Sequence, residues 1–268
     1  MDGLVIIDKP EGWTSHDVVA RARRVLREKR VGHTGTLDPF ATGVLVLLVG
    51  RATRLAQFLS GAEKEYEATV RLGYATDTGD LTGARREVGG GAFDCGALDR
   101  ARVEAALAPL RGEIEQVPPM YSAKKVQGKK LYELARRGEE VERAAVRVRV
   151  GSFEILDAPG VEFLRANADG TCDLRARVVC SAGTYVRVLA ESVGESLGTM
   201  TILMVVRTPT MVRSRRRVKV KSPILSVLFD MSRPARLAYG MALNLFASCV
   251  STAVRFATRS LWRLRCES

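Results

Sequence analysis

Residues that build metal centres and disulfide frameworks are scarce in this sequence. Its 268 residues include two His and five Cys, and the cysteines, at positions 95, 172, 180, 249 and 266, form no C-x-x-C pair. They are too few for a disulfide-built scaffold, and no His stands near one of them at the spacing of a metal site. We therefore expect ordinary buried or free thiols and no metal site.

Targeting features are also lacking. The N-terminus has no basic n-region, and its apolar run at residues 4–7 is too short for a signal peptide. One uncharged stretch, residues 237–254, is about long enough for a membrane span but contains Asn244 and several Ser and Thr. We expect a protein of the reducing cytoplasm with no membrane partner; a membrane span at 237–254 is the alternative.

The sequence does contain enough apolar residues for a folded core, together with an excess of positive charge. Its 46% hydrophobic residues exclude a disordered chain, and 24 Gly without a repeat exclude collagen. The 42 Lys and Arg against 30 Asp and Glu, a formal charge of +12, favour a nucleic acid partner, although a generic basic protein has the same balance. Residues 199–268 hold 13 basic and 2 acidic residues, which leaves 29 against 28 for residues 1–198. Net charge is therefore only weak evidence that residues 1–198 bind a nucleic acid.

Strand and helix patterns are mixed along residues 1–198. Residues 65–72 alternate strictly, which predicts a half-buried strand with Tyr66 on its apolar face. Residues 18–26 and 186–197 repeat apolar residues at helical spacing, and Thr14 or Ser15 can cap the first of these helices. Further runs at 4–7, 146–150 and 174–180 predict strands, and residues 98–110 predict a helix. The mixture predicts an α+β fold but does not determine its topology.

Three polar features interrupt these patterns. The loop at 32–43 places His33 and Asp38 among Gly and Thr, as suits a site of chemistry, although Asp before Pro is also an ordinary turn residue. Residues 118–132 combine four Lys with two Tyr, which suits nucleic acid binding or a solvated charge run. Arg187 falls in the first turn of a helix, where the dipole favours anions. It either has a carboxylate or phosphate partner or is exposed.

The sequence GHTGTLDPFATG at residues 32–43 resembles the signature loop of the TruB family of RNA pseudouridine synthases. Six such blocks in the family's order are far more specific than a single motif. The other five are DKPEGWTS at 8–15, Tyr66 on its strand, TDTGD at 76–80, YSA at 121–123 with Lys125 and Gly128, and SAGTYVR at 181–187.

The resemblance implies the pseudouridine synthase catalytic fold for residues 1–198, a mixed, largely antiparallel sheet flanked by helices. It implies an isomerase that converts uridine 55 in the T loop of tRNA to pseudouridine, moving the base from an N1 to a C5 glycosidic link. This reaction needs a carboxylate near the ribose and the ring, and no cofactor. We expect a monomer that binds the T-arm stem-loop of tRNA.

The resemblance assigns three catalytic residues. Asp38 is the carboxylate, acting as nucleophile or electrostatic partner by addition to the ring, attack on the sugar or a glycal route. Arg187 pairs with Asp38 and keeps it ionised, because a nearby opposite charge lowers the pKa of an acid. Tyr66 stacks on the target base and is the candidate for removal of the proton at C5.

The resemblance also assigns residues that bind the substrate. The target uridine must be flipped out of a folded loop, and His33 occupies or braces the vacated stack. Tyr185 lines the uridine pocket, and Val206 stands where the family has a pocket-lining leucine. Lys9 and Lys125 are expected to be structural or to contact phosphates rather than to take part in the chemistry.

Two alternatives to tRNA isomerisation stay open at this point. The first is a tRNA-binding and folding module that has the RNA surface without useful turnover. The second is a pseudouridine synthase that acts on another RNA. Pseudouridine formation on T-arm and other hairpins discriminates among the three.

The resemblance ends after Gly198. Residues 199–208 have the length of the next family strand but lack its Gly-Ala-His start and its Leu-Arg-Arg-Thr end, and no PUA-type domain follows. We interpret residues 199–268 as a divergent basic region with a frame-shifted or otherwise replaced C-terminus. A divergent accessory domain and a basic amphipathic membrane-surface segment are the alternatives. A replaced C-terminus would leave the catalytic core without its last family strand.

Overall fold

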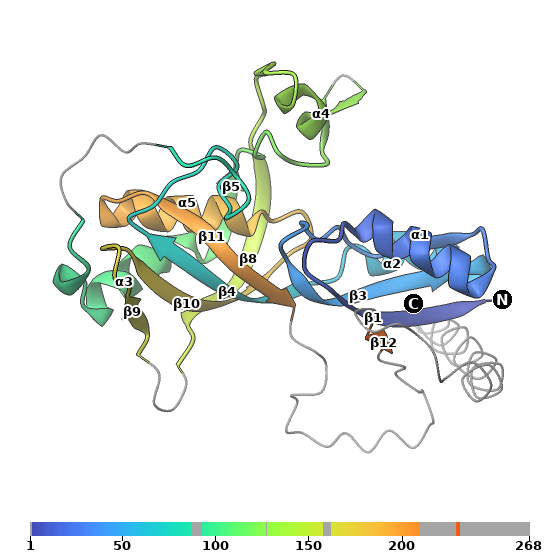
Figure 1. The fold of residues 1–268 in the computed structure, drawn as a ribbon, viewed down its shortest axis with the longest axis horizontal. Coiled ribbons are helices and arrows are strands. Elements are labelled where there is room, and N and C mark those ends of the chain that lie inside the picture. The colour runs from blue at the N-terminus through green and yellow to red at the C-terminus, as the bar shows by residue number, and fades with distance from the viewer. Residues whose placement is uncertain (1, 87–92, 127, 158–161, 209–228, 231–268) are drawn as a thin grey trace, which may run out of the picture. The chain divides into compact units, whose positions relative to one another are not determined.

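The structure, a computed structural model, describes residues 2–86, 93–126, 128–157, 162–208 and 229–230 (Figure 1). The chain divides into two compact units, one of residues 1–61 and 209–268 and one of residues 62–208. Among the described residues, no helix has the length and apolarity needed to cross a membrane. The basic run at 213–221 and the apolar stretch at 237–254 lie outside the described residues.

The first unit is built on a small sheet around β3, Thr42–Val49. Strand β1, Gly3–Lys9, and strand β2, Val31–His33, both pair with it in antiparallel fashion. The strand predicted at 4–7 is thereby confirmed and extended. The unit is completed by α1 (Ser15–Leu26), the 3-10 helix η1 (Gly50–Leu55), α2 (Ala56–Leu59) and β12 (Phe229–Asp230), which runs parallel to β1.

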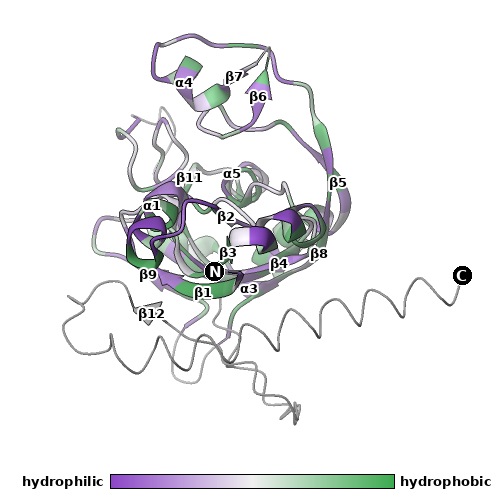
Figure 2. Cartoon of the chain, turned by 90° about the vertical axis from the view of Figure 1, so that its right-hand side faces the viewer, coloured by the Kyte–Doolittle hydropathy of each residue, from purple (hydrophilic) through white to green (hydrophobic). Residues whose placement is uncertain are grey.

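Helix α1 begins where the sequence predicts. Thr14 accepts a hydrogen bond from the backbone N–H of Asp17, and the Asp17 carboxylate accepts one from the backbone N–H of Thr14, which is a capping box. Val18, Val19 and Ala22 are buried on one side of the helix, while its arginines are exposed. Figure 2 shows hydrophobic and hydrophilic colours alternating along α1, as expected for an amphipathic helix.

The second unit is a larger antiparallel sheet with the strand order β11-β4-β10-β8-β5 and β9 added on β10. Helix α5 covers one face of it beside α3. A small excursion that contains the β6–β7 hairpin and α4 stands apart from the sheet (Figures 1 and 2). This mixed α+β architecture confirms the expected fold class.

The strands are β4 (Lys64–Leu72), β5 (Gly112–Gln116), β6 (Lys125–Val126), β7 (Lys129–Lys130), β8 (Val146–Ile155), β9 (Leu164–Ala166), β10 (Cys172–Cys180) and β11 (Thr201–Thr208). The helices are η2 (Cys95–Ala97), α3 (Arg100–Leu107), η3 (Ala108–Leu110), α4 (Leu131–Ala135) and α5 (Val186–Leu197).

The two faces of this larger sheet differ sharply. On one face, alternate side chains of β10 are fully buried with apolar residues of α3 and α5. On the other face, charged side chains pair across strands, with Arg71 on Asp173 and Arg177 on Glu65 at 2.7 Å each. Such partly exposed ion pairs contribute at most about 1 kcal/mol each, so the apolar face carries most of the stability.

Strand β11 shows that the sheet continues beyond residue 198, where we placed the end of the core. It pairs with β4 from Thr201 to Arg207, and its side chains Ile202 and Val206 are almost fully buried. The Thr201 hydroxyl also donates to the carbonyl of Ala190 in α5. The altered residues still form a strand because β-branched and apolar residues are retained at the positions that face the core.

The cysteines depart from expectation at one pair. Cys95 and Cys172 are joined as a disulfide across 77 residues of sequence, whereas we expected free thiols. The sequence does not reveal this pair because only the fold brings the two positions together. Cys180 is a free buried thiol, as expected, and Cys249 and Cys266 lie outside the described residues.

A comparison of two substitutions in β11 tests whether these residues form a real strand. Ile202→Ala removes a side chain that is 1% exposed and should lower the free energy of unfolding by about 2–4 kcal/mol. Val205→Ala, on the same strand but 49% exposed, should cost about 0.5 kcal/mol or less. Urea unfolding followed by circular dichroism gives both values. Equal effects of the two changes would mean that residues 201–208 are not packed as described.

Candidate active site

The Asp38 loop is fixed to the start of α1 through the residue that precedes Asp38. The backbone N–H of Leu37 donates to Ser15 Oγ at 2.9 Å, and Ser15 Oγ donates back to the Leu37 carbonyl at 3.4 Å. Ser15 and Leu37 are both buried, while the Asp38 side chain is half-buried. The carboxylate is therefore carried by a backbone that cannot shift without breaking buried hydrogen bonds.

The residue after Asp38 is held by Lys9. The Lys9 ammonium donates to the carbonyls of Pro10 at 3.0 Å, Trp13 at 2.6 Å and Pro39 at 3.1 Å, and its side chain is fully buried. Burial lowers the pKa of Lys9 to about 8, while the nearby Asp38 carboxylate acts in the opposite direction. All three ammonium hydrogens are used within the fold. These contacts favour the structural expectation for Lys9, and the phosphate contact stays a prediction.

His33 lies in β2 beside the other histidine of the chain. The rings of His33 and His16 meet edge to face, with centroids 5.6 Å apart and an interplanar angle of 78°. Burial lowers the pKa of His33, and a charge on His16 lowers it further. The His33 imidazole is therefore neutral at pH 7, which suits a ring that has to lie among uncharged bases.

In the second unit, Tyr66 and Val206 lie on the apolar side of the sheet. Tyr66 stands opposite Val178 of β10 and is half-buried, on the same face as the buried Ala68. The predicted direction of Tyr66 is thereby confirmed. Val206 of β11 is 4% exposed and stands opposite Ala68, which follows Tyr66 by two residues in β4.

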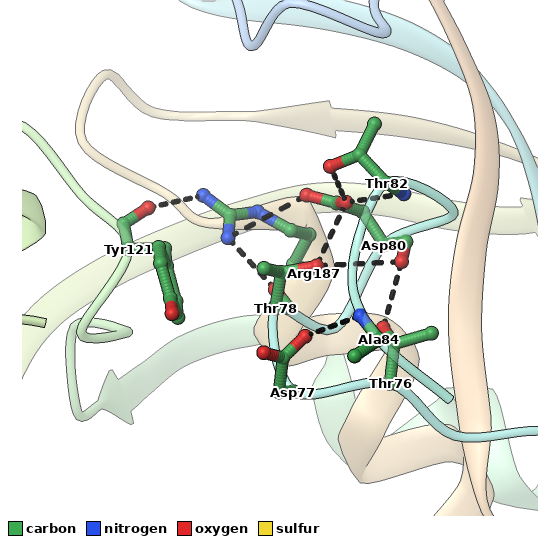
Figure 3. A network of polar contacts seen from close by, with 8 residues as sticks. All are labelled: Thr76, Asp77, Thr78, Asp80, Thr82, Ala84, Tyr121 and Arg187. Carbon is green, nitrogen blue, oxygen red and sulfur yellow. Dashed lines mark hydrogen bonds and ion pairs between the residues drawn. The ribbon is translucent and has the colours of Figure 1, made fainter. Parts of the chain in front are cut away.

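Arg187 is buried in the first turn of α5, where it contacts two loops (Figure 3). Its guanidinium donates to the carbonyl of Thr78 at 3.0 Å and to the carbonyl of Tyr121 at 2.7 Å. The Asp80 carboxylate lies 3.9 Å from Nη1. The exposed alternative for Arg187 is wrong, and the expectation of an anionic partner is met in this unit by Asp80.

Asp80 is a site residue that the sequence reasoning missed, because the TDTGD block at 76–80 was matched as a motif and no role was assigned to its carboxylates. The carboxylate is buried and accepts hydrogen bonds from Thr78 Oγ1 at 2.9 Å and from the backbone N–H and hydroxyl of Thr82. A Thr two residues before and two residues after an Asp is the signal that could have indicated it. No cluster of His, Cys, Asp and Glu capable of holding a metal occurs in the described part of the chain.

Gln116 is a second residue that was missed. Its side-chain oxygen accepts the backbone N–H of Tyr185 at 3.0 Å, and its Nε2 donates to the Tyr185 carbonyl at 3.4 Å. Gln116 is 3% exposed at the end of β5. This amide clamp fixes the N-cap of α5, and with it the position of the half-buried Tyr185 and of Arg187.

Lys125 lies in a small basic hairpin formed by β6 and β7, where it is exposed and pairs with Lys130. The Lys130 ammonium donates to the hydroxyl of Tyr132 at 3.2 Å and lies 5.3 Å from the centre of its ring. The hairpin thus combines exposed ammonium groups with an aromatic ring, which is the composition of a nucleic acid contact.

Comparisons with known proteins give the family of this chain. The family model described as TruB family pseudouridylate synthase (N terminal domain) matches residues 23–186. The tRNA pseudouridine synthase B of Bacillus thuringiensis (strain Al Hakam) is 52% identical over 199 residues, which cover 74% of this chain and 62% of the relative. The chain belongs to the TruB family. A second relative of this TruB-family chain, tRNA pseudouridine synthase B of Geobacillus thermodenitrificans (strain NG80-2), is 52% identical over 198 residues, 74% of this chain and 63% of its own length. The chain thus spans a little over three fifths of the length of these curated relatives.

Solved structures give the same assignment. The TruB-family chain resembles a protein in the crystal structure of a Cbf5-Nop10-Gar1 complex, with a TM-score of 0.53 and 29% identity over 76% of this chain and 47% of that one. It also resembles a chain in the structure of an H/ACA RNP bound to a substrate RNA containing 2'-deoxyuridine, with a TM-score of 0.51 and 27% identity. The latter match covers 76% of this chain and 46% of that one.

The expected site residues of this TruB-family chain are divided between the two units. Lys9, His33 and Asp38 belong to the first unit, where the Asp38 carboxylate opposes the lowering of the Lys9 pKa by burial. The second unit holds Tyr66, Lys125, Tyr185, Arg187 and Val206. Within it, Arg187 is held by Thr78 and Tyr121 and the adjacent Tyr185 by Gln116, whereas the pairing of Asp38 with Arg187 stays a prediction.

Replacement of the buried lysine tests whether it braces the Asp38 loop. Lys9→Met keeps the length of the side chain but leaves three carbonyls without their donor, so the free energy of unfolding should fall by roughly 2–4 kcal/mol. Lys29→Met, at an exposed position of the same unit, should change it by about 0.5 kcal/mol or less. Chemical denaturation measures both, and full stability of Lys9→Met would contradict the brace.

Proposed function

We propose that this chain converts uridine 55 in the T loop of tRNA to pseudouridine, with Asp38 as the reacting carboxylate and without a cofactor. Membership of the TruB family supports the reaction class. The observation that carries the proposal is the rigid mounting of Asp38, since Leu37 and Pro39, on either side of it, are both held by buried side chains. A catalytic carboxylate must be placed with this accuracy, because small displacements of a reacting group lower the rate strongly.

The chemistry requires few groups. The bond from ribose C1' to uracil N1 breaks, the base rotates, and a bond from C1' to C5 forms, while a proton leaves C5 and a proton is added at N1. No electron acceptor takes part. Asp38 supplies the carboxylate that acts at the sugar or at the ring, and it is assisted by a base for the proton at C5.

Arg187 is the proposed partner of Asp38. Its guanidinium is already buried, and its contacts to Thr78 and Tyr121 hold it in one orientation. A fixed, buried cation of this kind keeps an adjacent carboxylate ionised and aimed. The carbonyl contacts therefore position Arg187 for the acid, and the Asp80 carboxylate limits the cost of burying its charge.

Tyr66 and His33 are proposed to handle the flipped base. Tyr66 has an apolar neighbourhood on its sheet face, which suits a ring that stacks on uracil, and its hydroxyl is the candidate base for the proton at C5. The neutral His33 ring is proposed to fill the place that the uridine leaves in the T loop. Filling the gap offsets part of the few kcal/mol that base flipping costs. Tyr185 and Val206 complete the uridine pocket in this proposal.

The tRNA is proposed to be held by the basic hairpin. Lys125 and Lys129 are exposed there, so their ammonium groups are free to approach phosphates. The chain is proposed to work as a monomer in the cytoplasm, where its tRNA substrate is present. The T-arm stem-loop is the smallest RNA that presents the target uridine in its folded loop.

Replacement of the carboxylate tests the reaction. Asp38→Asn is expected to lower pseudouridine formation on a T-arm hairpin roughly 1000-fold or more while hairpin binding stays within about threefold. Asp157→Asn removes an exposed carboxylate that pairs with the exposed Arg100, and it should keep full activity. Mass spectrometry of the labelled uridine and a filter-binding assay provide the two readouts.

The outcomes of this assay separate the alternatives. Full activity of Asp38→Asn would contradict the assigned mechanism. Tight binding by the unmodified chain without any product would overturn the isomerase and leave a tRNA-binding module. Product on an unrelated hairpin but not on the T-arm would move the activity to another RNA.

A second substitution tests the RNA contact. The double change Lys125→Gln with Lys129→Gln should raise KM and reduce the slope of log affinity against log salt by about 1 for each lysine, with kcat unchanged. Arg165→Gln, at an exposed position of β9, is the matched control and should leave the slope as it is. Binding titrations between low and high salt measure the effect, and an unchanged slope in the double variant would exclude the hairpin from the interface.

A further inference from the structure

Cys95 and Cys172 form a second chemical site in the larger unit, unrelated to the isomerase residues. Cys95 opens the 3-10 helix η2 directly before α3, and Cys172 is the first residue of β10. Their Cα atoms are 6.1 Å apart, within the range of about 4.4–6.8 Å that a disulfide needs. We propose that this pair is a reversible redox site, oxidised by exchange with a small-molecule disulfide of the glutathione class, which stabilises the larger unit.

Both positions are determined by backbone contacts that do not depend on the bond. The Asp94 carboxylate accepts the Gly96 N–H at 2.8 Å, which fixes the turn at Cys95. Cys172 is held in the sheet between Leu72 of β4 and Ala166 of β9. These contacts remain when the bond is reduced, so oxidation is expected to require no rearrangement of the fold.

The two sulfurs differ in access, which determines the order of the exchange. Cys172 is fully buried, while Cys95 is half-buried between the exposed residues Asp94 and Gly96. Cys95 is therefore the sulfur that meets a disulfide from solution. Cys180 offers a contrast, because burial raises the pKa of its thiol to about 11 and it is fully enclosed, so it does not react.

The exchange balances without any other reactant. The Cys95 thiolate attacks oxidised glutathione, which forms a mixed disulfide and releases one glutathione thiolate. The Cys172 thiolate then attacks the Cys95 sulfur and releases the second glutathione. Two thiols of the protein lose two electrons and two protons, and one glutathione disulfide becomes two thiols. Excess reduced glutathione reverses both steps.

The disulfide between Cys95 and Cys172 is proposed to stabilise the larger unit and not to control the isomerase reaction. The bond joins residues 77 apart, so it removes a large part of the freedom of the unfolded chain. Leu72, opposite Cys172, is six residues along β4 from Tyr66, a separation of roughly 20 Å. The bond therefore leaves the neighbourhood of Tyr66 unchanged.

The test treats the native full-length chain with oxidised glutathione or with dithiothreitol and digests it with trypsin without reduction. Oxidation should link the tryptic peptides 87–100 and 166–175, which contain Cys95 and Cys172. It should also raise the melting temperature by roughly 5–15 °C. Cys95→Ser should show neither effect, and Cys180→Ala should show both.

Each outcome decides the proposal. Absence of the linked peptide after oxidation of the native chain, or a linked peptide with no rise in melting temperature, would overturn it. The kcat for pseudouridine formation should agree within twofold between the oxidised and reduced forms, and a larger difference would contradict the separation of the two sites. If the chain proves to have no isomerase activity, the peptide and melting measurements still stand by themselves.

Discussion

The placement of Asp38 depends on one buried cation. The Lys9 ammonium is withdrawn from water and surrounded by carbonyls of Pro10, Trp13 and Pro39, so the end of β1, the turn before α1 and the Asp38 loop share a single hydrogen-bonding centre. The desolvation that lowers the pKa of Lys9 to about 8 is a cost, which carbonyls held at these distances and the nearby Asp38 carboxylate offset. Any movement of the loop would leave part of the charge unpaired, so the brace resists displacement.

Arg187 in the second unit resembles Lys9, because its buried charge also binds backbone carbonyls. It too is a buried cation whose close hydrogen bonds run to backbone carbonyls of two loops, at Thr78 and Tyr121. A side-chain acid can rotate away from its partner, but a carbonyl moves only with its backbone. A cation that binds carbonyls therefore fixes loop positions, and it adds to the hydrogen bonds that these loops make among their own residues. Residues proposed to be catalytic can therefore keep a fixed position although they lie in or beside loops.

The sequence predicts those features that follow from local periodicity. The start of α1 at its capping box, the first turn of α5 around Arg187 and the inward direction of Tyr66 all depend on neighbours within a few residues. Asp38 was recognised through a motif. The carbonyl partners of Lys9, the Gln116 clamp on Tyr185 and the bond between Cys95 and Cys172 join positions far apart in the chain, for which a single sequence holds no periodic signal. Strand β11 is intermediate, because its apolar pattern is retained although its family motif is lost.

The distribution of charge on the larger unit bears on how it can bind a polyanion. The charges on the polar face of its sheet are partly paired, since Arg71 and Arg177 are each engaged by a carboxylate of the neighbouring strand. These arginines cannot contact phosphates without giving up an existing partner. The exposed ammonium groups of Lys125 and Lys129 carry no such restriction among the described residues. A nearly neutral core attracts RNA weakly at long range, and local groups of cations such as Lys125 and Lys129 would then determine where the RNA lies.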